Sequence, residues 1–205
     1  LKSAARERWA QGGSAYVRGE LGQTRDWRVF RNAKPLVDPV SKEVLGYEAP
    51  YLGTAQYARV GSTSPTGEIV PASFTVQSVR QEIGVGDRLS PVPEREFVNY
   101  VPHAPQGEVD GRIAALYGDA LTAGQNQIVV LNKGDKDGLE RGHVLALWRY
   151  GRTTLDRTYG DKTAIKLPDE RHGVLFVFRV FDRMSYALIL SVEEPVQVGD
   201  RFTQP

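Results

Sequence analysis

The stretch VQSVRQEIGVGDRL, from Val76 to Leu89, decides the fold, because it recurs in altered form as ILSVEEPVQVGDRF, from Ile189 to Phe202. Both stretches contain Ser-Val and then Val-Gly-Asp-Arg followed by an apolar residue, and the shared residues lie 113 positions apart. Glycine adopts a positive φ without a Cβ clash, and an aspartate side chain accepts hydrogen bonds from nearby backbone amides. Each Gly-Asp pair therefore predicts a turn between two strands, and we interpret the repeat as a duplicated β-unit rather than a duplicated binding site.

The repeat extends upstream of this turn. Ala58–Val60 aligns with Phe178–Val180 at an offset of 120 positions. The offset falls to 113 further along, because the first half has the longer loop GSTSPTGE where the second half has only FDRM. Each half thus contains a hairpin, an apolar strand, a Gly-Asp turn and a closing strand. Because a solenoid needs three or more repeats, we expect a mainly β chain with two related small β-barrel or sandwich units in tandem.

Composition and proline spacing predict where these units end. The chain has 205 residues, of which 40% are apolar and 25% charged, as in an ordinary globular protein. Pro91, Pro93, Pro102 and Pro105 predict an extended connector, since proline lacks a ladder donor and fixes φ. We expect a short helical or irregular N-terminal segment over 1–25, a first β-unit over 26–95, a Pro-rich connector over 96–107 and a second β-unit over 108–205.

Local patterns predict individual strands. In the first unit we expect a strand over Trp27–Arg31, a turn over Pro35–Lys42, and strands around Val44–Tyr51 and Thr54–Val60. Near the C-terminus, the long β-branched run GVLFVFRVFDRMSYALILSV is interrupted only by Asp-Arg, so we expect two strands joined by a tight turn at Phe181–Ser185.

Several function classes are not supported by the sequence. The formal net charge of +1 lacks the basic excess of a nucleic-acid binder, no apolar run is long enough to span a membrane, and the absence of cysteine excludes disulfides and thiolate metal sites. Motifs of hydrolytic nucleophiles, of a P-loop and of a complete dinucleotide loop do not occur. We therefore expect no enzymatic activity and no cofactor.

The residues that could bind metals have simpler interpretations. We interpret His103, His143 and His172 as surface or packing residues, since none has a second ligand at a local metal-binding spacing. Asp135 and Asp137 resemble the start of a calcium loop, but the continuation lacks the required acidic residues. No metal site is expected.

Aromatic residues alternate with arginines, as in Trp27–Arg31, Trp148–Tyr150 and Phe176–Phe181. Such a pattern is compatible with a face on which bases or other ligands stack. Because Trp27 and Val29 share one face of a strand, packing in a core is the simpler interpretation. A ligand-binding face stays open as the alternative.

The stretch YGRTTLDRTYGDKTAIKLPDERH, from Tyr150 to His172, is the longest polar interruption of the second half. Long connections in compact domains are often functional. From Arg149 to Leu167 it carries five basic and two acidic residues, and tyrosine and arginine are enriched at interface hot spots. The hypothesis is a partner-binding arm with Tyr150, Arg152, Arg157 and Tyr159 as anchors, and the alternative is a solvated hairpin without a partner.

Three longer stretches resemble a known family. They are VFRNAKPLVDPVSKEVLGYEAPYLGTAQ (29–56), VVLNKGDKDGLERGHVLALWR (129–149) and VFRVFDRMSYALILSVEEPVQVGDRF (177–202). Together with the order of these phrases over about residues 14–204, they resemble the type IV pilus secretin-associated proteins, a proteobacterial family with an N-terminal, peptidoglycan-binding lysin motif. The second half also resembles the C-terminal region of the flagellar T-ring protein.

The lysin motif itself is not expected within this chain. The stretch around Gly86-Asp87 has a superficial likeness to it, but Pro91 and Pro93 follow where the motif has a helix. The start LKSAARERWA contains neither Met nor a signal peptide, so we expect the chain to be the ordered part of a longer polypeptide.

The resemblance implies a non-enzymatic, periplasmic role. The lysin motif outside this chain would bind peptidoglycan, and the region described here would dock on the outer-membrane secretin of the pilus machine. Several copies would form a ring around the secretin, and no nucleic acid would be bound. The alternative function is a carbohydrate-binding β-module that binds peptidoglycan directly.

Overall fold

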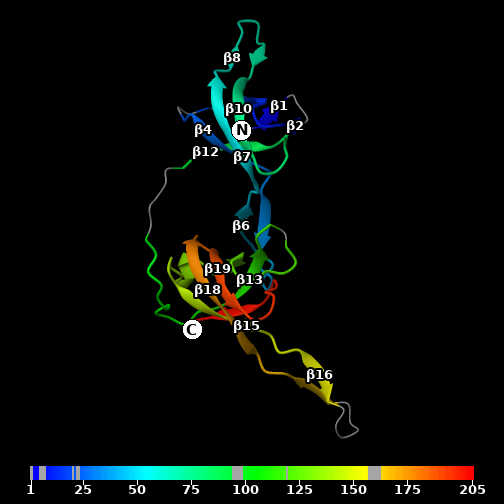
Figure 1. Ribbon diagram of the computed structural model, residues 1–205, viewed down its shortest axis with the longest axis vertical. Coiled ribbons are helices and arrows are strands. Elements are labelled where there is room, and N and C mark those ends of the chain that lie inside the picture. Colours follow the sequence, from blue (N-terminus) through cyan, green and yellow to red (C-terminus); the bar gives the residue numbers. More distant parts are fainter. Residues whose placement is uncertain are drawn as a thin grey trace. The chain divides into compact units, whose positions relative to one another are not determined.

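The computed structural model describes residues 2–4, 8–19, 21, 24–93, 99–118, 120–156 and 163–205. These residues form β-strands and one 3₁₀ turn, Asp135–Asp137, so the prediction of a mainly β chain is confirmed (Figure 1). The chain divides into two compact units: residues 1–34 with 47–97, and residues 35–46 with 98–205. The described residues include no helix with the length and hydropathy needed to cross a membrane.

The first unit is built around a six-stranded closed barrel with the strand order β1-β12-β4-β7-β10-β3. Its core contains Trp27, Val29, Leu52 and Phe74, and the Trp27 and Phe74 rings meet edge to face with centroids 5.8 Å apart. The interpretation of Trp27 and Val29 as core residues is therefore confirmed. The strands are β1 (Lys2–Ala4), β3 (Ser14–Arg18), β4 (Asp26–Phe30), β7 (Tyr51–Arg59), β10 (Ala72–Val79) and β12 (Arg88–Pro91), with β2 (Arg8–Trp9) paired to β11 (Ile83–Gly84).

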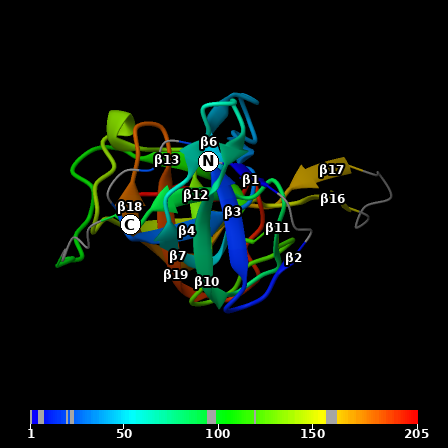
Figure 2. The same cartoon turned by 90° about the horizontal axis from the view of Figure 1, so that it is seen from above.

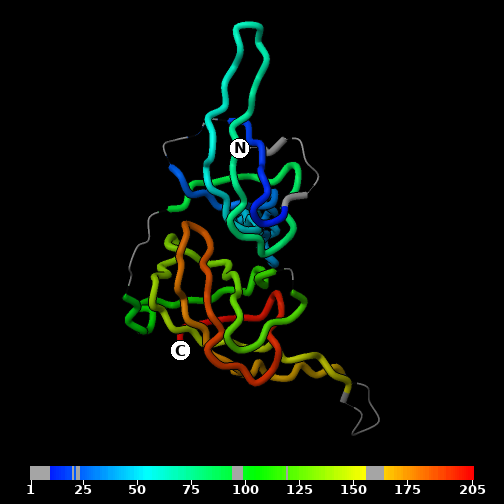
Figure 3. The backbone as a smooth tube through the Cα atoms, turned by 45° about the horizontal axis from the view of Figure 1, so that its top comes forward, coloured from blue at the N-terminus to red at the C-terminus, as the bar shows by residue number. Residues whose placement is uncertain are grey.

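A long hairpin extends from the first barrel between β7 and β10. Its two short strands, β8 (Ser62–Thr63) and β9 (Ile69–Val70), pair with each other. The hairpin projects from the barrel in Figure 3. On the barrel itself, β3 lies beside β10 along the pairs from Val17–Ala72 to Ser14–Thr75 (Figure 2).

The second unit contains a closed barrel with the strand order β13-β14-β19-β18-β15-β20. Its core is mostly aliphatic and includes one phenylalanine, with Leu145, Leu175, Ile189 and Phe202 fully buried. The expected tight turn after Val180 is confirmed, because β18 and β19 pair as antiparallel neighbours across it. The strands are β13 (Asp110–Leu116), β14 (Ile128–Leu131), β15 (Val144–Arg149), β18 (Glu170–Val180), β19 (Ser185–Val192) and β20 (Arg201–Thr203).

The two barrels have the same topology. In each, the first strand pairs with the second and the sixth, and the third pairs with the sixth and the fourth. The repeated turns also agree in detail: Gly86 has φ +95° and Gly199 has φ +97°. The carboxylate of the following aspartate accepts the amide three residues before it, Gly84 N–H to Asp87 at 2.8 Å and Gln197 N–H to Asp200 at 2.7 Å. The prediction of two related β-units is therefore confirmed.

The N-terminal segment differs from the expectation of a helical or irregular stretch. Its described residues form strands, and β1 and β3 are the first two strands of the first barrel. The pair Lys2–Arg88 joins β1 to β12 and closes the barrel. The first repeat therefore begins inside residues 1–25, because the barrel needs these two strands to satisfy the ladder groups of β10 and β12.

The predicted turn over Pro35–Lys42 is partly a strand. β5 (Lys34–Val37) pairs with β6 (Val44–Glu48), and the turn between them is closed by the Asp38 carboxylate, which accepts the Val40 amide at 2.7 Å. Residues 35–46 belong to the second compact unit, although the sequence suggested the first. The reason is hydrophobic: Leu36 and Leu45 join Ala114, Val130 and Met184 in one apolar cluster.

Candidate functional site

The predicted arm forms a hairpin that projects from the second barrel (Figure 1). β16 (Thr153–Asp156) pairs with β17 (Thr163–Lys166) between β15 and β18. We define the arm as residues 150–169. Of the four predicted anchors, Tyr150 and Arg152 lie at its base, and Arg157 and Tyr159 lie outside the described residues.

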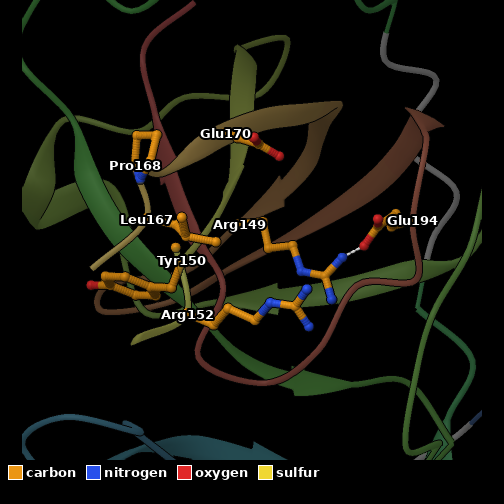
Figure 4. A pocket seen from close by; sticks show the side chains of 8 residues that line it. Arg149, Tyr150, Arg152, Leu167, Pro168, Glu170 and Glu194 are labelled. Atoms are coloured by element: carbon orange, nitrogen blue, oxygen red, sulfur yellow. Dashed lines mark ion pairs between the residues drawn. The ribbon is translucent and has the colours of Figure 1, made fainter. Parts of the chain in front are cut away.

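A cavity of about 530 Å³ lies at the base of the arm. Its charged lining consists of Arg149, Arg152, Glu170 and Glu194, and Arg149 forms an ion pair with Glu194 (Figure 4). The Arg152 guanidinium points to the same side as that of Arg149, is exposed, and has no hydrogen-bond or ion-pair partner among the described residues. The two arginines and two glutamates balance in charge, so the cavity suits a partner with groups of both signs.

Backbone packing makes the base of the arm a defined support for these side chains. A Cβ at Gly151 would overlap the Leu167 carbonyl. The backbone before β16 and the backbone after β17 therefore approach each other as closely as only glycine permits. The Gly151 amide donates to the Asp169 carboxylate at 3.0 Å, and the Leu167 amide donates to the Arg152 carbonyl at 3.1 Å. These hydrogen bonds fix the position of the Arg152 backbone at the base of the arm.

Tyr150 lies on the other side of the arm base and points away from Arg152 in Figure 4. The Arg112 guanidinium donates to the Tyr150 hydroxyl and lies 5.1 Å from the ring centroid, while the Lys166 ammonium lies 5.4 Å from it. Cations at such distances interact with the face of an aromatic ring. Tyr150 is therefore held by its own chain, and the structure does not bring the two described anchors together.

The cluster continues from Arg112 to residues that the sequence analysis did not select. Asp110 accepts hydrogen bonds from Arg112 at 2.8 Å and from Arg201 at 2.9 and 2.8 Å. Hydrogen bonds from Arg201, and then from Arg112, hold the pKa of Asp110 below its usual value. No sequence signal links Arg201 to Asp110 and Arg112, because Arg201 reaches them only through the pairing of β20 with β13.

The structure brings together two histidines that the sequence analysis treated separately. His103 and His143 form a parallel bridge with ring centroids 4.8 Å apart, and Glu140 places its carboxylate within 4.8 Å of their nitrogens. His103 Nδ1 donates to the Val101 carbonyl at 2.8 Å, which leaves its Nε2 free as a ligand. His143 Nδ1 accepts the Glu140 amide at 3.1 Å.

This cluster fits a metal ion poorly. Burial, and then the charge of His103, lower the pKa of His143, so its imidazole is neutral near pH 7. With Nδ1 acting as an acceptor, the single ring proton of neutral His143 lies on Nε2, and neither nitrogen offers a free lone pair. His103 and Glu140 are the two remaining donors, fewer than the three or four protein ligands of zinc sites. We assign no metal to this cluster.

His172 lies in β18 rather than in the expected loop. It is 6% exposed, and neither ring nitrogen has a hydrogen-bond partner among the described residues. Burial lowers the pKa of His172 and raises the pKa of the neighbouring Asp200 carboxyl. Burial thus disfavours the charged forms of both groups, so the structure gives His172 a packing role.

The arm base thus offers recognition through ion pairs and hydrogen bonds around a polar cavity. Comparison of the sequence with protein-family models and with curated proteins finds no match.

Proposed function

We propose that this chain is a non-enzymatic structural accessory protein of the type IV pilus machine. It docks on the outer-membrane secretin in the periplasm, and a lysin motif outside this chain anchors the assembly to peptidoglycan. The phrases that resemble the secretin-associated family support this role, as do two β-barrels with a projecting hairpin and a polar contact surface.

The observation that carries the docking role is the arm base. Arg152 presents an exposed guanidinium without a partner among the described residues, beside the Arg149–Glu194 ion pair and on a backbone fixed by Gly151. Arginine is enriched at interface hot spots, because its planar guanidinium donates several hydrogen bonds at once. We infer that the secretin supplies a carboxylate or carbonyl group to Arg152.

The test is co-purification of the protein with the secretin from cells. Arg152→Glu should leave the thermal unfolding of the protein unchanged and reduce the recovered complex about tenfold or more, as expected for a hot-spot residue. Lys136→Glu is the control, because this lysine is 65% exposed, pairs only with the exposed Asp182 among the described residues, and lies at the opposite end of β18 from the arm. Full recovery of the complex with Arg152→Glu, at low and high salt, would exclude the arm base as the docking surface.

A second assay separates docking from direct glycan binding. If the chain is a docking module, it stays in the supernatant when mixed with isolated sacculi and centrifuged. Sedimentation with the sacculi would instead support the carbohydrate-binding alternative.

A further inference from the structure

The duplication includes a hairpin as well as a barrel. In each repeat of the sequence, a two-stranded hairpin is inserted between the third and fourth barrel strands: β5–β6 after β4, and β16–β17 after β15. Three residues separate β5 from β4 and β16 from β15, and β7 and β18 begin 119 positions apart, as β5 and β16 do. The inserted segments, residues 31–50 and 150–169, are therefore equal in length, and β5 and β16 correspond residue by residue at this offset.

The hairpin β5–β6 shows what such an insertion does. Leu36 is 5% exposed and packs with Ala114, Val130 and Met184 on the outside of the second barrel. Asn132 donates to the Asp38 carboxylate at 2.8 Å, and Arg183 pairs with Glu43. The hairpin β5–β6 is thus a barrel-docking element, with an apolar anchor and polar contacts at its turn.

The hairpin β16–β17 has the same anchor without a barrel beneath it. Leu155 lies 119 positions after Leu36, in the same place on its strand, but it is 49% exposed. Ile165 is also exposed, but it pairs with Thr154 and lies on the opposite face from Leu155, which pairs with Ala164. A two-stranded hairpin on its own is marginally stable in water, so Leu155 is expected to be covered in the assembled protein.

The first barrel has a groove that includes two positions equivalent to residues around β5–β6 on the second barrel. The pairing of β3 with β10 corresponds to the pairing of β14 with β19. At an offset of 114 positions Arg18 is the counterpart of Asn132, and at an offset of 113 positions Pro71 is the counterpart of Met184. Both Arg18 and Pro71 line a groove of about 630 Å³, together with the exposed apolar residues Val60, Ile69 and Val70. Two of the positions beside β5–β6 on the second barrel, Asn132 and Met184, thus correspond to residues that line a groove with exposed apolar side chains on the first barrel.

We propose that the β16–β17 hairpin of one copy of this chain docks in the groove of the first barrel of a second copy. Leu155 fills the role in this contact that Leu36 fills within the chain. The interface is heterologous, since hairpin and groove are different surfaces, and such contacts propagate into a ring or a filament. This contact involves only two copies of the chain, so it forms or fails to form independently of the secretin.

The absence of cysteine allows a direct cross-linking test. Thr153→Cys places one thiol on the hairpin, and Ser62→Cys places one at the groove, which Ser62 lines. The two variants, one of them tagged, are mixed without secretin and joined by a short bismaleimide. We expect a cross-linked heterodimer in the mixture and at least tenfold less product from either variant alone.

Two further samples complete the test. Adding Leu155→Asp to the hairpin variant should abolish the heterodimer, and because Leu155 is exposed the monomer should unfold at an unchanged temperature. A chain with both cysteines should cross-link between copies. The proposal is overturned if the mixture yields no heterodimer, if Leu155→Asp leaves the yield unchanged, or if the doubly substituted chain joins its two thiols within one copy at high dilution.

Discussion

Leu36→Ala tests whether the hairpin β5–β6 contributes to the stability of the second unit. Leu36 is buried in the cluster with Ala114, Val130 and Met184. Truncation of a buried leucine to alanine costs about 2–5 kcal/mol, depending on how far the surroundings collapse into the space. Because a surface hairpin can move inward, we expect the lower part of this range, about 2–3 kcal/mol of unfolding free energy.

The corresponding change at Leu155 is the control. Leu155→Ala removes the same atoms from an exposed position, so in the isolated chain it should alter the unfolding free energy by less than about 0.5 kcal/mol. Urea unfolding of both variants measures the difference, and the methyl resonance of Met184, the single methionine, reports the packing of the hairpin directly. A loss of less than about 1 kcal/mol for Leu36→Ala, or equal losses for both substitutions, would show that β5–β6 does not stabilise the second unit through Leu36.

Three further predictions follow from buried or constrained residues. Ile189→Asp places a carboxylate in a fully buried position, so we expect a loss of several kcal/mol and little folded protein by circular dichroism. Gly86→Ala and Gly199→Ala should each cost about 1–2 kcal/mol in urea unfolding, and unequal costs would argue against equivalent turns. Because burial lowers the folded pKa of His172 and His143, unfolding binds protons below about pH 6.5. Stability should therefore fall from pH 7.5 to 5.5, and His172→Leu should reduce this slope; an unchanged slope would contradict the packing role of His172.

The repeated Gly-Asp stretch could predict much of the fold, because a turn that needs a positive φ is encoded by a few adjacent residues. Gly86 and Gly199 mark such turns, and the alternation around Trp27 marks a buried strand face. Strand β1 could not be predicted in this way. Its residues show no alternation, and its partner β12 lies more than eighty positions away, at Lys2–Arg88.

The hairpin β5–β6 shows a similar limit. Sequence patterns indicate that Leu36 is apolar, but they do not indicate which barrel covers it. Its contact with Val130 depends on tertiary packing between residues far apart in the chain. For the same reason, the pairing of His103 with His143 could not be predicted from local spacing.

Only part of the candidate site could be predicted. Counting basic residues between Arg149 and Leu167 selected the arm, and Arg152 does present an exposed charge at its base. The same count could not show that Tyr150 is held by Arg112, because β13 and β15 meet only through β20. Charge and composition thus indicated the arm as a partner-binding segment. Strand pairing decides which of its side chains are free to contact a partner.

The most direct test of the proposed function is a cryo-EM map of the secretin purified together with this protein. We expect density for pairs of small β-barrels in a ring around the secretin, with the base of the arm, at Arg152, against the secretin surface. A map in which the secretin carries no such barrels at saturating protein, or in which the barrels contact it only through surfaces remote from the arm, would contradict the account.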